Sequence, residues 1–164
     1  MNNLIVKGVL LSCMVTLMIS CNPKKEVPLV TVVDTAQIKK EIQAKEDEFA
    51  ATYNSHEMKN IGYYADDAIS FSQNKAPLVG KKSITEYLIA NMDSPAKSNK
   101  ISYKTNEIYV SNEGNQVVEI GYYQVVEATN NSTINSGNYI CLFVKRDGKY
   151  FCLRDMSTSD VPLK

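Results

Sequence analysis

The stretch that decides the fold is Tyr139–Arg154, which reads YICLFVKRDGKYFCLR. Two apolar runs flank the dipeptide Asp147-Gly148, and Asp-Gly between such runs is among the strongest local signals for a two-residue hairpin turn. This turn sets Arg146 opposite Lys149, and each further pair lies one residue outward along both strands. The stretch therefore predicts two antiparallel neighbours in a sheet.

The predicted register sets Cys141 opposite Arg154 and places apolar side chains on both faces of the hairpin. One face is expected to carry Tyr139, Cys141, Phe143, Tyr150, Cys152, Arg154 and Met156. The other is expected to carry Ile140, Leu142, Val144, Phe151, Leu153 and Asp155. Because each apolar face needs a covering, we expect helices and a pocket on one face and a second copy of the chain on the other.

The sequence on either side of this hairpin predicts an α+β domain. Strands with a period of two are expected near residues 101–110, 116–128, 134–146 and 149–157, and they form a four-stranded antiparallel meander. Upstream, Asp34 or Thr35 caps a helix that runs to about Asn54. The segment between them predicts a short helix over 57–64, a strand over 68–72, a short strand at 77–79 and a third helix over 83–89.

Composition limits the classes of function. The 18 basic residues balance the 18 acidic ones, so nothing indicates a surface for nucleic acid. The chain has one histidine and no cluster of cysteine and histidine, so we expect no transition-metal site and no cofactor. Cys141 and Cys152 lie diagonally to each other in the predicted register, which favours two reduced core thiols over a disulfide.

The N-terminus is typical of an exported lipoprotein. Residues 1–20 contain one charge followed by an apolar run too short to span a bilayer, as in a signal peptide. Met18-Ile19-Ser20-Cys21 resembles the bacterial lipobox, so Cys21 is the expected lipid site, with residues 21–33 as a tether and the domain over 34–160. The cell envelope is the expected location, with the lipid as the membrane contact. An alternative lipobox ends at Cys13, and an ordinary signal peptide without a lipid is a further alternative.

Several local strings resemble the nuclear transport factor 2-like superfamily, in particular its SnoaL-like branch and neighbouring domains of unknown function. These strings are Tyr64-Ala65-Asp66-Asp67-Ala68, Gly80-Lys81-Lys82-Ser83-Ile84, Glu107-Ile108-Tyr109-Val110-Ser111, Gly121-x-Tyr123 and Lys145-Arg146-Asp147-Gly148-Lys149-Tyr150. The resemblance implies a cystatin-like cone, in which a bent antiparallel sheet wraps around three N-terminal helices and encloses a pocket. It also implies dimers that pair through the outer face of the sheet. The base of the superfamily's steroid isomerases corresponds to Ser72 here, and a serine hydroxyl is no proton acceptor near neutral pH.

Seven residues are candidates for lining the pocket. They are Tyr53, His56, Tyr64, Tyr123, Tyr139, Arg154 and Asp155. The chain contains ten tyrosines, whose rings and hydroxyls suit a small aromatic or lipid-like ligand but also suit a ligand-free core. Arg154 either binds an anionic group in the pocket or pairs with Glu119 or Asp155 as a structural contact.

The sequence thus predicts a lipid-anchored, dimeric SnoaL-like domain that binds a small apolar molecule, with no chemistry assigned. The first alternative is an acid–base enzyme of the isomerase, cyclase or hydrolase type. That alternative requires Asp155, Arg154, His56 or Tyr53 to meet at one pocket, with a carboxyl whose pKa is shifted by burial. The second alternative is an interaction module without a pocket.

Overall fold

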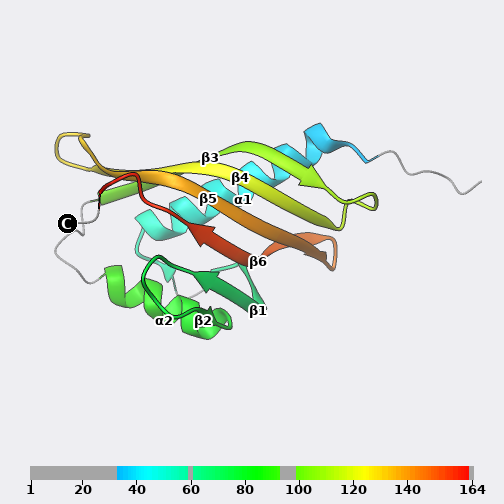
Figure 1. Cartoon of the computed structure of the whole chain (residues 1–164), viewed down its shortest axis with the longest axis horizontal. Helices are drawn as coiled ribbons and strands as arrows, with labels where there is room; N and C mark the ends of the chain where they lie inside the picture. Colours follow the sequence, from blue (N-terminus) through cyan, green and yellow to red (C-terminus); the bar gives the residue numbers. More distant parts are fainter. Residues whose placement is uncertain (1–32, 59–60, 93–98, 163–164) are drawn as a thin grey trace, which may run out of the picture. The chain divides into compact units, whose positions relative to one another are not determined.

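The computed structural model describes residues 33–58, 61–92 and 99–162, which form two α-helices and one six-stranded sheet (Figure 1). The helices are α1 (Thr35–Asn54) and α2 (Lys81–Met92). The strands are β1 (Tyr64–Phe71), β2 (Leu78–Val79), β3 (Asn99–Val110), β4 (Gln116–Glu127), β5 (Thr133–Arg146) and β6 (Lys149–Ser157). Their order across the sheet is β2-β1-β6-β5-β4-β3.

The predicted export segment lies outside the described residues. This holds for the signal peptide over 1–20, for Cys21 and for all of the tether except Val33. Among the residues that the structure describes, no helix is long and apolar enough to cross a membrane.

Helix α1 begins and ends where its sequence predicts. The Asp34 carboxylate accepts a hydrogen bond from the backbone N–H of Gln37 at 2.9 Å, so Asp34 is the N-cap. The buried face of the helix consists of Ile38, Ile42, Glu46, Phe49 and Ala50. Four of these five are apolar, and the burial of Glu46 among them is the first indication of a polar site.

Side-chain amides of α1 bind the open edge of the sheet at β3. Gln43 donates to the carbonyl of Tyr103 at 3.1 Å and accepts from the N–H of Thr105 at 2.8 Å. Asn54 makes the same pair of contacts with the carbonyl and N–H of Ile101, at 2.9 and 2.8 Å. These contacts satisfy backbone groups that an edge strand otherwise leaves open to another chain.

The sheet is mixed and open, which corrects the expected antiparallel cone. Strands β3 to β6 form the predicted antiparallel meander, but β1 runs parallel to β6, with Tyr64 opposite Cys152. Strands β2 and β3 are the two edges of the described sheet, so it does not close on itself. Helix α2 packs against β1 and β2, whereas α1 packs against β3 (Figure 1).

The structure has two α-helices rather than the predicted three. The helix expected over 57–64 is wrong, because Tyr64 already belongs to β1 and no α-helix forms among the described residues of that segment. Met58, Ile61 and Tyr63 are all buried there, and the Tyr63 carbonyl accepts the N–H of Cys152 at 2.9 Å. Pairing with β6 therefore outweighs the helical tendency of this segment.

The predicted hairpin register is right at the turn and wrong beyond it. The pairs from Arg146–Lys149 to Phe143–Cys152 match the prediction, but a β-bulge then sets Leu142 opposite Arg154 and Cys141 opposite Asp155. A shift of one residue exchanges the two faces of a strand. Arg154 therefore leaves the face that carries Cys141, and Asp155 takes its place.

The contacts of Gln43 yield a test of how α1 is held to the sheet. We expect Gln43→Ala to lower the free energy of unfolding by about 1–3 kcal/mol, because it leaves two half-buried backbone groups of β3 without partners. The measurement is urea denaturation.

Gln37→Ala is the matched control, since it removes the same side chain from an exposed position of the same helix, where Gln37 contacts Glu41. Its expected effect is within about 0.5 kcal/mol. Equal losses in the two variants would contradict this account of the edge.

Candidate functional site

A cavity of about 140 Å³ lies between the two helices and the inner face of the sheet. It is several times the roughly 30 Å³ that one water occupies in the liquid. Six aromatic residues, two carboxylic acids and no basic residue line it. The lining consists of Glu46, Phe49, Tyr63, Tyr64, Ser70, Ser72, Leu78, Ile84, Tyr87, Leu88, Tyr103, Tyr139, Cys141, Asp155, Met156 and Ser157.

Two buried glutamates lie beside this cavity. Glu46 projects from α1 and Glu119 from β4, and their side chains are 1% and 0% exposed. The hydroxyl of Tyr63 donates to Glu46 Oε1 at 2.5 Å. Thr105 Oγ1 and the Tyr139 hydroxyl both donate to Glu119 Oε1, at 2.5 and 2.8 Å. Glu119 thus accepts two hydrogen bonds from neighbouring hydroxyls, whereas Glu46 accepts one.

This difference decides which glutamate keeps a proton. Burial and the negative charge of Glu119 raise the pKa of Glu46 well above its ordinary value of 4.5. Burial also raises the pKa of Glu119, but the hydrogen bonds from Thr105 and Tyr139 lower it again. Glu119 Oε2 is buried and accepts no hydrogen bond from the described N–H and O–H groups. We infer that protonated Glu46 donates to ionised Glu119, so that the pair shares one proton.

The shared proton links stability to pH. Because the pKa of Glu46 is higher in the folded chain than in the unfolded one, the folded state binds more protons in the interval between the two values. Protonation of Glu46 therefore contributes fully to the free energy of unfolding below about pH 4.5. This contribution is lost as the pH rises through the pKa that Glu46 has in the folded chain.

Cys141 lies next to the pair. One ligand atom from each of Glu46, Glu119 and Cys141 lies within 4.8 Å of the others. A hydrogen bond with Cys152 and burial raise the pKa of the Cys141 thiol, which keeps it protonated and a poor ligand for a cation. A shared proton therefore accounts for this cluster without a metal ion. Both Cys141 and Cys152 are free and buried, as the diagonal register predicts.

Gly121 makes room for the contact between Tyr139 and Glu119. Tyr139 lies directly across from Gly121 in the pairing of β4 and β5. A Cβ atom on Gly121 would lie 2.2 Å from the Tyr139 ring, far inside contact distance. Any side chain at this position would displace the ring, and the hydroxyl would lose its position next to Glu119.

Asp155 supplies the second carboxyl of the cavity. The bulge in β6 turns it inward, where the Tyr64 hydroxyl donates to its Oδ2 at 2.9 Å. Its Oδ1 is buried and has no partner among the described groups. Burial raises the pKa of Asp155, and interactions with the hydroxyls of Ser70 and Tyr64 lower it in part. The cavity wall therefore includes a buried acceptor atom, Asp155 Oδ1, that a ligand can satisfy.

The seven sequence candidates divide into two groups. Tyr64, Tyr139 and Asp155 line the cavity together. Tyr53 and Tyr123 pack against the rings of Phe49 and Tyr103, each with 6.4 Å between centroids, and are not part of the lining.

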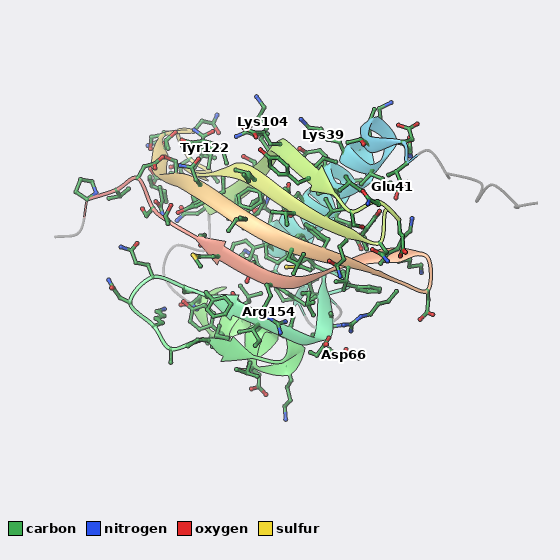
Figure 2. The ribbon with its side chains drawn as sticks, turned by 45° about the vertical axis from the view of Figure 1, so that its right-hand side comes forward. Lys39, Glu41, Asp66, Lys104, Tyr122 and Arg154 are labelled. Carbon is green, nitrogen blue, oxygen red and sulfur yellow. The ribbon has the colours of Figure 1, made fainter. Side chains whose placement is uncertain are left out.

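The remaining candidates, His56 and Arg154, also lie away from the lining. His56 is an exposed residue with φ of 61° just after α1. Arg154 extends from β6 toward β1, where its guanidinium donates to the Asp67 carbonyl at 3.1 Å (Figure 2). The structural pair of Arg154 with Glu119 or Asp155 does not form.

Sequence reasoning missed the two glutamates, although both carry a signal. Glu46 follows Ile42 by four residues and so falls on the apolar stripe of α1. Glu119 shares the alternating inward face of β4 with Val117 and Tyr123. A charged residue in phase with a buried face indicates a paired or protonated group. Ser72, which the resemblance to the superfamily predicted at the place of the isomerase base, lines the cavity.

Comparison with known proteins identifies the fold but no closer relative. No family model and no curated protein sequence matches the chain. A domain of unknown function with a cystatin-like fold from Nostoc punctiforme superposes with a TM-score of 0.68 at 14% identity, covering 79% of this chain and 81% of that one. A ketosteroid isomerase-like protein from Erwinia carotovora atroseptica gives a TM-score of 0.58 at 14% identity, covering 75% and 96%.

A third solved structure carries the superfamily name. It is an NTF2-like protein with a cystatin-like fold from Novosphingobium aromaticivorans, with a TM-score of 0.61, 10% identity and coverage of 74% and 81%. At these identities the likeness shows the fold alone. The chain therefore has the cystatin-like fold of the nuclear transport factor 2-like proteins, built as an open, mixed six-stranded sheet with two helices.

Proposed function

We propose that the chain is an exported, lipid-anchored protein of SnoaL-like type whose domain binds a small, mostly apolar molecule in the cavity beside Glu46 and Asp155. The fold is commonly a scaffold for ligand binding or catalysis. The observation that carries the proposal is Asp155 Oδ1, a buried polar atom without a partner at the wall of a largely aromatic cavity. Such an atom is costly unless a ligand or an ordered water binds it.

The size of the cavity sets the size of the ligand. Its volume of about 140 Å³ resembles that of engineered apolar cavities of roughly 150 Å³, which bind benzene. The ligand or the part of it that enters is therefore about as large as one six-membered ring.

The second candidate function is acid–base catalysis at Asp155. Its favouring observation is the raised pKa of this carboxyl, which brings its titration closer to neutral pH. Against it, Ser72 cannot act as a base, and His56, Arg154 and Tyr53 lie outside the cavity lining. Ligand binding requires only the cavity and Asp155, whereas catalysis requires further acidic or basic side chains at the cavity. We therefore rank ligand binding first.

We further propose that two copies pair through the outer face of the sheet. Ile140 and Met156 are 43% and 49% exposed there. With Phe71, Val118 and Leu142 they border an outer groove of about 180 Å³. Apolar side chains exposed together on a sheet face support a protein contact.

Filling the cavity tests the binding proposal. Leu78 and Val79 are adjacent in β2, but Leu78 lines the cavity whereas Val79 is 67% exposed. We expect Leu78→Trp to weaken binding of 4-fluorophenol at least tenfold, because the indole occupies the space of the ring. The measurement is ¹⁹F NMR titration, combined with native mass spectrometry for a co-purifying molecule.

Val79→Trp is the matched control and should bind the phenol like the wild type. Binding that is equally strong in the Leu78→Trp variant would place the probe elsewhere. Absence of binding by the wild type, together with no co-purifying molecule, would remove the support for a ligand-binding cavity.

Lipid attachment at Cys21 is tested by a second matched pair. In a bacterial host, Cys21→Ser should abolish labelling with radioactive palmitate and release the protein from the membrane fraction, because the acyl chains are its anchor. Cys13→Ser should keep both the label and the membrane association. The reverse pattern would move the site to Cys13, and labelling of neither protein would indicate an ordinary signal peptide.

A further inference from the structure

We propose that the ligand is a small organic cation of the alkylammonium class, an inference that rests on the proposed binding function and specifies its ligand. The cavity joins six aromatic rings to two carboxyl groups, and none of its lining residues is basic. Aromatic rings attract alkylammonium ions through their negative faces, and a nearby carboxylate adds a direct charge partner.

The hydrogen-bond pattern argues against an anionic ligand. The hydroxyls of Tyr63, Tyr64 and Tyr139 already donate to Glu46, Asp155 and Glu119 respectively. These three tyrosines therefore have no O–H left for a carboxylate or phosphate, and ionised Asp155 would repel an anion. Asp155 Oδ1 has no hydrogen-bond partner among the described groups and is an acceptor that a donor or a positive charge can satisfy.

The neighbouring cations of the protein are held elsewhere. Arg154 donates to the carbonyl oxygens of Asp67 and Leu153. Arg146 forms a two-pronged ion pair with the Asp67 carboxylate, at 2.6 and 3.0 Å. Neither guanidinium neutralises Asp155, so the charge of its ionised form is available to a ligand.

One lining ring, Tyr87, already contacts a cation of the protein, because Lys75 donates a hydrogen bond to its hydroxyl and lies near its ring. The ammonium of Lys75 lies 4.4 Å from the centre of the Tyr87 ring, and Lys75 is itself exposed and not part of the lining. Tyr87 shows that the rings of this site accept an ammonium ion at their surface. The more deeply buried rings of Phe49 and Tyr103 are better shielded from water, where such contacts are stronger.

The test compares choline with 3,3-dimethylbutan-1-ol, which has the same shape and hydroxyl but no charge. Isothermal titration calorimetry of the purified protein in detergent should show choline binding at least tenfold more tightly. Asp155→Asn should weaken choline binding at least tenfold and leave binding of the alcohol within about threefold. Asp66→Asn, which removes an exposed carboxylate, is the control and should change neither affinity.

The two ligands are compared on the wild-type protein, so the test does not depend on whether the Asp155→Asn variant folds. If the uncharged alcohol binds as tightly as choline, the ligand is neutral and the cation proposal is overturned, while the proposed binding function stands. If neither compound binds, the cation proposal is overturned as well. The independent 4-fluorophenol titration then decides whether the cavity binds ligands at all.

Discussion

The inferred sharing of one proton between the buried Glu46 and Glu119 carboxyls is the constraint on which the interior of this domain depends. It joins α1 to the middle of the sheet at a point from which water is excluded. Two ionised carboxylates at that place would repel each other, and a lone buried charge would be strongly destabilising. One shared proton removes the repulsion, and the hydrogen bonds from Thr105 and Tyr139 stabilise the one negative charge that remains. The surrounding residues then serve to keep that proton in place.

Several features of the sheet follow from this requirement. Thr105 and Tyr139 stabilise the ionised member of the pair, and Tyr63 binds the protonated one. Tyr139 reaches Glu119 across a residue without a side chain, so Gly121 belongs to the same arrangement. Three of the five tyrosine hydroxyls of the cavity donate to carboxyls, and Asp155 Oδ1 is a buried acceptor in its wall without a hydrogen-bond partner among the described groups. The same hydrogen bonds between tyrosine hydroxyls and carboxyls therefore stabilise the core and decide which polar groups the cavity presents to a ligand.

Sequence patterns predicted the elements of this fold better than their details. The Asp147-Gly148 turn, the cap at Asp34 and the antiparallel meander are local signals, and the structure confirms them. The bulge in β6 left no local signal, and the parallel pairing of β6 with the distant strand β1 is irregular at the same place, between Cys152 and Arg154. This bulge exchanged the positions of Arg154 and Asp155 and so changed the predicted site. The helix expected over 57–64 failed for the same reason, since pairing with β6 determines that segment.

The central claim is that the glutamate pair shares one proton above the ordinary carboxyl pKa of 4.5, and a titration of the side-chain carboxyl ¹³C resonances of Glu46 and Glu119 tests it most directly. Glu46→Gln and Glu119→Gln spectra supply the assignments. We predict that the two carboxyls ionise in separate steps and that the Glu46 carbon still has the shift of a protonated acid at a pH at which Glu119 has ionised. Complete ionisation of both carboxyls near their ordinary pKa of 4.5 would contradict the account.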